Sequence, residues 1–291
     1  MAGLELTGLE NKVAVVTGAG RMRSIGRSLA VEIARAGCDV VITGTGRDPS
    51  RYPDAEKAAG WRDIESVAEE IRGLGRRALP VVTDVTDPDA VEALAQQTLS
   101  ELGRVDFIVN NAGPARGEDR NAVVDVPLDA WQNVIDINLN GAFYMSRAFG
   151  KRLIAQGEGG AIINISSIGG KIMLPNNAAY AASKAGQNAL TACMAREMGV
   201  HNIRVNAICP GLIDTSRMDD MQRSGAADDG GEVKAGTLGF SWEGYIEGNI
   251  PLKRAGVGRD IANMAVYLCS EQGSWVTGQA INVDGGNCVW H

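Results

Sequence analysis

A tyrosine and a lysine stand four positions apart in the stretch "YAASK" at 180–184. The amphipathic pattern over 178–198 predicts a helix, which would put the side chains of Tyr180 and Lys184 on one face. An ordinary tyrosine ionises near pH 10. A cation about 4 Å away, in an effective dielectric of about 20, favours the phenolate by about 4 kcal/mol before desolvation is counted. The pair therefore predicts a tyrosine that exchanges a proton with a bound substrate.

A glycine-rich turn near the start of the chain predicts phosphate binding. The stretch "VTGAGRMRSIGRSLA" at 16–30 follows an apolar run, and its glycines allow a close approach of the backbone to a pyrophosphate. Ser24 is expected to cap a helix over 24–36, whose N-terminus attracts anions. The turn is longer than usual, because Gly18 and Gly26 are eight positions apart. The role of Gly20 is therefore left open.

Short apolar segments alternate with helical patterns along the whole chain. Segments that are apolar throughout, separated by amphipathic stretches such as 64–73 and 88–102, predict a parallel sheet with helices on both faces. This is the doubly wound α/β (Rossmann-type) fold, expected here as one domain over 1–291, with ligands bound beyond the carboxyl ends of the strands. The seven expected strands are 12–17, 39–43, 78–85, 105–110, 161–166, 203–208 and 279–283.

The composition excludes several classes of protein. The formal net charge is −7 and the sequence pI is about 5.0, which argues against a nucleic-acid partner because such partners require clustered Lys and Arg. No apolar run reaches the roughly 18 residues of a membrane span. Residues 1–12 do not resemble a signal peptide, so a cytoplasmic protein is expected. With two histidines and five scattered cysteines, we expect no metal site, no Ser-His-Asp triad, and reduced cysteines that fill the core.

Further segments follow the strands in a characteristic order. They are "NNAG" at 110–113, "DINLNGAF" at 136–143, "NISS" at 164–167, "YAASK" at 180–184, "CPGLIDT" at 209–215 and "VTGQAINVDGG" at 276–286. Together with the glycine-rich turn they resemble the short-chain dehydrogenase/reductase family over essentially the whole chain. The resemblance implies an NAD(P)-dependent oxidoreductase that transfers a hydride between the nicotinamide and a small-molecule secondary alcohol or ketone.

The resemblance also implies roles for single residues. Ser167, thirteen positions before Tyr180, is expected to hydrogen-bond the substrate oxygen, whereas Ser166 is expected to be structural. Lys184 would favour the ionised tyrosine and hold the ribose, and Asn138 would support a proton path through a water beside the lysine. The residues expected along the cofactor are Gly18, Gly20, Arg21, Arg23, Ser24, Ile25, Gly44, Arg47, Asp84, Val85, Asn111, Ala112, Gly113, Tyr180, Lys184, Pro210, Gly211, Ile213 and Thr215.

The choice between the two dinucleotides depends on the end of the second strand. NAD-specific relatives usually carry an acidic residue there, which bonds the ribose hydroxyls. In this chain the place is taken by Gly44. The missing carboxylate removes repulsion against a 2′-phosphate, with which Arg21, Arg23 or Arg47 could pair. We therefore expect NADP(H), with NAD(H) as the alternative if Asp48 bends back toward the ribose.

Three other readings compete with a general ketone reductase. The stretched turn resembles that of divergent enoyl reductases, but in those the tyrosine and lysine are separated by six residues rather than three. A 3-oxoacyl thioester reductase is the nearest alternative. A dinucleotide sensor without turnover is the alternative from another class, although a sensor needs no aligned Ser, Tyr and Lys.

Further expectations concern two long segments and the assembly of the chain. Residues 46–63 form an expected surface insertion that either covers the cofactor or serves an interface. Residues 212–250 are expected to border the substrate as a lid, in which Phe240, Trp242 and Tyr245 either close over the substrate or fill the core. The resemblance also implies a homotetramer or homodimer, assembled through the long helix near 178 and the last strand, and the apolar Val289 and Trp290 beyond that strand would suit packing against another subunit.

Overall fold

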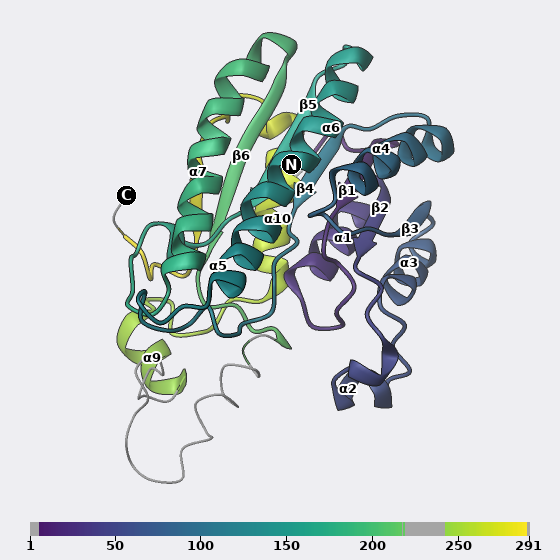
Figure 1. Cartoon of the computed structure of the whole chain (residues 1–291). Coiled ribbons are helices and arrows are strands. Elements are labelled where there is room, and N and C mark those ends of the chain that lie inside the picture. The colour runs from purple at the N-terminus through teal and green to yellow at the C-terminus, as the bar shows by residue number, and fades with distance from the viewer. Residues whose placement is uncertain (1–5, 217, 219–241, 290–291) are drawn as a thin grey trace, which may run out of the picture.

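A computed structural model describes residues 6–216, 218 and 242–289, and its centre is a seven-stranded parallel sheet (Figure 1). The strand order is β3-β2-β1-β4-β5-β6-β7. Every expected strand is present, with ends that differ by at most three residues from the sequence patterns. The strands are β1 Val13–Val16, β2 Asp39–Gly44, β3 Ala78–Val82, β4 Phe107–Asn110, β5 Gly160–Ile165, β6 Ile203–Pro210 and β7 Ala280–Val283.

Helices cover both faces of the sheet, as expected when strands are apolar throughout. On one face, α1 Ile25–Arg35, α3 Ile64–Gly73 and α10 Gly258–Cys269 share a buried apolar cluster with the strands. On the other face, α4 Pro88–Leu102, α6 Gly141–Gln156 and α7 Ala178–Met198 share a second cluster. Four of the five cysteines are buried as predicted, but Cys193 on α7 is exposed, because it lies on the outer face of that helix.

The direction of chain winding reverses between β1 and β4. After β1 the chain builds outward to β2 and β3, and from β4 onward it builds outward in the opposite direction. The connections that follow β1 and β4 therefore separate at the carboxyl edge, which leaves a crevice where ligands bind in this fold. This is the end of the molecule that carries the loop after β1, the short helix α2 Asp54–Ala58 and α9 Trp242–Asn249 (Figure 1).

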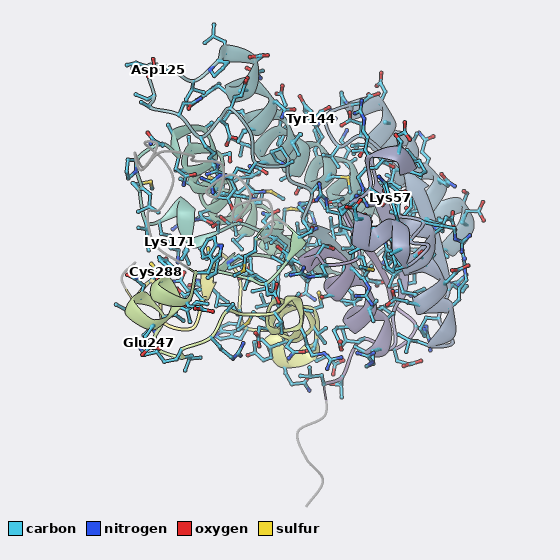
Figure 2. The ribbon with its side chains drawn as sticks, turned by 90° about the horizontal axis from the view of Figure 1, so that it is seen from below. Lys57, Asp125, Tyr144, Lys171, Glu247 and Cys288 are labelled. Atoms are coloured by element: carbon cyan, nitrogen blue, oxygen red, sulfur yellow. The ribbon has the colours of Figure 1, made fainter. Side chains whose placement is uncertain are left out.

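The two sides of this end come from distant parts of the chain. Seen from below, Lys57 on α2 lies on the opposite side of the molecule from Lys171 and Cys288 (Figure 2). Within the described residues, no helix is both long and apolar enough to cross a membrane. Nor does the described part of the chain contain a group of three or more His, Cys, Asp or Glu placed to hold a metal ion.

Candidate active site

A cavity of about 640 Å³ opens at the carboxyl ends of the strands, and it collects almost every residue that the sequence singled out. Asn138 is the exception, because it is buried behind the cavity wall. The predicted residues that line the cavity are Gly18, Gly20, Arg21, Arg23, Ser24, Ile25, Gly44, Arg47, Asp84, Val85, Asn111, Ala112, Gly113, Ser167, Tyr180, Lys184, Pro210, Gly211, Ile213 and Thr215.

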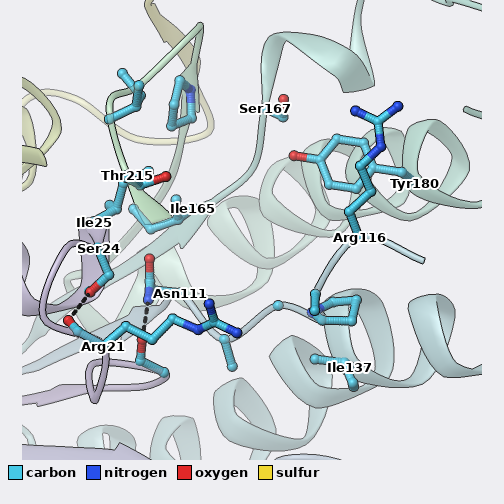
Figure 3. Close-up of a pocket in the computed structure, with 18 of the residues that line it drawn as sticks. Arg21, Ser24, Ile25, Asn111, Arg116, Ile137, Ile165, Ser167, Tyr180 and Thr215 are labelled. Atoms are coloured by element: carbon cyan, nitrogen blue, oxygen red, sulfur yellow. Dashed lines mark hydrogen bonds between the residues drawn. The ribbon is translucent and has the colours of Figure 1, made fainter. Parts of the chain in front are cut away.

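Ser167 and Tyr180 lie close together in the wall of this cavity, since a Cβ built on Gly169 would lie 3.3 Å from Ser167 Oγ and 3.1 Å from Tyr180 Cε1. Ser167 follows β5 and begins a short 3-10 turn, where its Oγ accepts a hydrogen bond from the Gly169 N–H at 3.0 Å. Tyr180 lies in the first turn of α7. Both residues line the cavity and Figure 3 shows the Tyr180 hydroxyl near Ser167, so a substrate oxygen there can meet both side chains. The Ser166 hydroxyl instead donates to the Lys184 carbonyl oxygen at 3.0 Å, which fits a structural role.

Lys184 lies one turn after Tyr180 and is almost fully buried. Its Nζ is 5.8 Å from the centroid of the Tyr180 ring. The same Nζ donates to the Ile165 carbonyl oxygen at 2.8 Å and to Gln187 Oε1 at 2.9 Å. Hydrogen bonds to carbonyl oxygens satisfy a buried ammonium and fix its direction. The cation is therefore held beneath the tyrosine rather than left to reach solvent.

Gln187 connects the lysine to Asn138, which the sequence reasoning did not anticipate. Its Nε2 donates to the Asn138 carbonyl oxygen at 2.7 Å. That carbonyl lies in a single π-helical turn, Asp136–Asn140, inserted between α5 Leu128–Ile135 and α6. Such a turn releases a backbone carbonyl from the regular helical bonding pattern. The only sequence signal for Gln187 was its place three residues after Lys184, on the same helical face.

The stretched turn after β1 is shaped for a dinucleotide. Ser24 caps α1 as predicted, since its Oγ accepts from the Arg27 N–H at 3.1 Å and donates to the Arg21 carbonyl oxygen at 2.9 Å (Figure 3). A Cβ at Gly18 would lie 2.8 Å from the Ala112 Cα, and one at Gly26 would lie 2.4 Å from the Gly18 carbonyl oxygen. The close approach, together with the open N-terminus of α1, fits a pyrophosphate.

At the end of the cavity beside β2, Arg47 is paired with carboxylates of the chain itself. Arg47 was expected to pair with a 2′-phosphate, but its guanidinium bonds Asp63 Oδ2 and Glu56 Oε2, each at 3.0 Å. Asp63 is buried and lies beside Gly44 at the end of β2. Asp48 does not bend back toward the ribose, because its carboxylate accepts from the Ser50 N–H and caps a 3-10 turn. No sequence pattern near β2 predicted that Asp63 would lie beside Gly44.

Two arginines lie at the opposite end, beside the tyrosine. The Arg120 guanidinium is 4.4 Å from the centroid of the Tyr180 ring and contacts Asp119 at 3.0 Å. Arg116 extends along the same ring (Figure 3). Burial lowers the pKa of the Arg116 guanidinium and the charge of Asp119 partly offsets this, but an arginine remains protonated at neutral pH. With two guanidinium groups and the one carboxylate of Asp119, this end of the cavity is therefore positively charged.

Aromatic side chains border the same end. Trp242 and Tyr245 on α9 line the cavity and are half-buried, with their ring centroids 6.2 Å apart. The Tyr245 hydroxyl accepts from Asn287 Nδ2 at 2.8 Å. Of the two alternatives for these rings, the position beside the cavity is the one observed. Phe240 lies outside the described residues, as does most of 212–250.

Comparisons with known proteins agree with this geometry. Residues 18–287 match the family described as enoyl-(acyl carrier protein) reductase. The chain is 35% identical over 283 residues to 2-dehydro-3-deoxy-D-gluconate 5-dehydrogenase of Escherichia coli K12, with 96% of each chain covered. It is 36% identical over 275 residues to the 3-oxoacyl-(acyl-carrier-protein) reductase FabG of Staphylococcus aureus, covering 94% of this chain and 97% of the relative. The solved structure of carveol dehydrogenase from Mycobacterium avium in complex with NAD matches with a TM-score of 0.81 at 30% identity, over 96% of this chain and 98% of that one.

Proposed function

The chain belongs to the short-chain dehydrogenase/reductase family and is an NAD(P)-dependent oxidoreductase of alcohols or ketones, and on this premise we propose which of its residues perform the reaction. Tyr180 is the acid/base, Ser167 orients the substrate oxygen, and Lys184 supports the tyrosine. The observation that carries the proposal is that Ser167 and Tyr180 lie close together in the wall of one cavity, which the glycine-rich turn after β1 also lines.

The proposed chemistry follows from what each side chain can donate. When bound, the nicotinamide supplies or accepts the hydride. In ketone reduction, Ser167 donates a hydrogen bond to the carbonyl oxygen, and Tyr180 transfers its phenolic proton to that oxygen as negative charge develops on it. The nearby Lys184 ammonium stabilises the phenolate that remains. In alcohol oxidation the same groups act in reverse.

We propose that Gln187 and Asn138 position the lysine. The support is the continuous chain from Lys184 Nζ to Gln187 Oε1, and from Gln187 Nε2 to the Asn138 carbonyl oxygen. An amide side chain here holds the ammonium at a set distance below the tyrosine. The role first expected of Asn138, with a water beside the lysine, is thus proposed to be shared with Gln187.

We propose that the substrate carries an anionic group near its reacting carbon. Arg116 and Arg120 both border the cavity beside Tyr180, where a carboxylate would find charge-assisted hydrogen-bond donors. The E. coli relative is named for a gluconate, which is itself a carboxylate. A keto acid, such as a sugar acid, is therefore the substrate class that fits this end of the cavity.

Replacing Arg116 by Met tests this substrate class. We expect kcat/KM for carboxylate-bearing ketones to fall about 10- to 100-fold, because a charge-assisted hydrogen bond contributes about 1.5–3 kcal/mol. Reduction of the matching neutral ketones should change little. The measurement is NAD(P)H oxidation on paired neutral and acidic substrates, with Arg147→Met on the exposed surface of α6 as the matched control. Equal losses on both substrate types would contradict an anionic substrate.

A second candidate is 3-oxoacyl thioester reduction, favoured by the 36% identity to FabG of Staphylococcus aureus. In the substrate panel, faster turnover of a 3-oxoacyl thioester than of any keto acid would establish it. The enoyl reductase reading has the family description in its favour. Consumption of reduced cofactor with an enoyl thioester but with no ketone would establish that reading, and cofactor binding without any turnover would favour the sensor.

We also propose that the chain assembles with copies of itself, as a homotetramer or homodimer. Trp275 and Val289, which lie on either side of β7, are 98% and 70% exposed. Burial of such large apolar side chains against a partner removes them from water. We expect light scattering on the purified protein to give the mass of two or four chains. A mass of one chain would be the contrary result.

A further inference from the structure

The insertion at 46–63 is packed against the stretched phosphate-binding turn. The Trp61 Nε1–H donates to the Gly20 carbonyl oxygen at 2.6 Å, and the Met22 N–H donates to Glu56 Oε1 at 2.9 Å. Glu56 is 2% exposed. These bonds join the backbone of the long turn to the half-buried Trp61 and the buried Glu56 of the insertion. The two departures from the usual pattern, the long turn and the insertion, are thus complementary parts of one structure.

The insertion also brings a carboxylate to the end of β2. Asp63 is 6% exposed and has a φ of 53°, in the left-handed region. A Cβ built on Gly20 would lie 1.3 Å from Asp63 Oδ1, and one built on Gly44 would lie 3.3 Å from it. Both glycines and Asp63 line the cavity. Gly44 is the place where an acidic side chain of β2 would stand, and the missing Cβ leaves room for Asp63 there.

The net charge around Asp63 is negative, which disfavours binding of a 2′-phosphate there. Arg47 is bonded to both Asp63 and Glu56, so this group of three side chains carries two carboxylates and one guanidinium. The other arginines of the turn have partners elsewhere: Arg23 pairs with Asp214, and Arg21 donates to Ser216 Oγ at 3.4 Å. The net negative charge disfavours the 2′-phosphate that distinguishes NADP(H) from NAD(H).

We propose that Asp63 binds the adenosine ribose hydroxyls and makes this enzyme selective for NAD(H). Asp63 is the last residue of the insertion and lies directly before α3. Its carboxylate is proposed to bind the ribose as an acidic residue at the end of β2 does in other dinucleotide-binding folds. The inference rests on the proposed function only in requiring that the cavity binds a dinucleotide. It replaces the preference for NADP(H) expected from Gly44 and the arginines.

Binding measurements on the purified protein test the proposal without turnover. Calorimetric titration with NADH, NADPH, ADP-ribose and 2′-phospho-ADP-ribose gives four dissociation constants. We expect wild type to bind the forms without the 2′-phosphate at least about tenfold more tightly. In Asp63→Asn, this preference should fall about tenfold or more, because the neutral amide no longer repels a phosphate. Asparagine tolerates the left-handed backbone at this position, so the variant keeps the local fold.

The matched control is Asp54→Asn, an exposed acidic residue of the same insertion, which should keep the wild-type preference. A wild-type preference for NADPH, or an unchanged preference in Asp63→Asn, would overturn the role of Asp63 while leaving the proposed function intact. Failure of wild type to bind either dinucleotide would instead overturn the proposed function together with this inference. If Asp63→Asn does not fold, the wild-type ratio for the two ADP-ribose compounds still decides.

Discussion

Tyr180→Phe is expected to lower kcat by about 10²- to 10⁴-fold, the range that general acid–base catalysis contributes. The substitution removes only the phenolic oxygen from a ring whose surroundings include the Arg120 guanidinium and Lys184 Nζ. Without that oxygen, the proposed proton donor beside Ser167 is lost. The ring itself stays, so the shape of the cavity and the affinity for the dinucleotide should be retained.

Two measurements check this result. Steady-state rates of reduced-cofactor consumption give the loss in turnover, and fluorescence titration with NADH and NADPH shows whether binding persists. Tyr144→Phe, on α6 and outside the residues that line the cavity, is the matched control and should keep wild-type activity. Turnover of Tyr180→Phe within a few fold of wild type would remove the tyrosine from the acid/base role.

Gly26→Ala is expected to cost about 1–3 kcal/mol in the free energy of unfolding and to weaken dinucleotide binding at least about tenfold. A Cβ there would lie 2.4 Å from the Gly18 carbonyl oxygen and 2.8 Å from the Ala19 Cα. Both are backbone atoms, so the clash cannot be relieved by rotating a side chain. The turn has to move away from α1, and the amides at the helix N-terminus lose their alignment with the pyrophosphate.

Thermal unfolding and NADH titration measure the two effects separately. Gly73→Ala is the matched control, because a Cβ there meets nothing within 4 Å and the residue ends α3. Since alanine favours a helix over glycine by up to about 1 kcal/mol, this control should unfold at the same or a higher temperature. Wild-type binding by Gly26→Ala would mean that the stretched turn does not hold the pyrophosphate as proposed.

The contacts between the turn and the insertion are expected to affect how the cofactor is recognised. Trp61 and Glu56 bond the backbone of the turn, and Asp63 lies between that turn and β2. A change in the insertion is therefore expected to reach both the pyrophosphate and the ribose. Dinucleotide selectivity in this chain is proposed to depend on an element outside the strand–turn–helix unit that usually determines it.

Local sequence patterns determined the elements and most of the residues around the cavity. The periodicity of apolar residues is a property of neighbours along the chain, so it predicted the seven strands and the helices α3, α4 and α7 at their observed positions. Ser24 was predicted to cap α1 for the same reason, because a cap acts within three residues. Tyr180 and Lys184 were predicted to share a helical face, since that follows from helix geometry alone.

Tertiary structure decided the contacts between segments that are distant in sequence. Asp63 is 43 positions from Gly20 and 19 from Gly44, yet it lies against both. Gln187 bonds Asn138 across 49 positions, and Arg120 lies over Tyr180. No periodic sequence pattern predicts these contacts, because the distance between the two residues of each pair depends on the path of the loops that return to the sheet. The partners of Arg47 could not be predicted for the same reason: Glu56 and Asp63 come from a segment whose path only the folded chain determines.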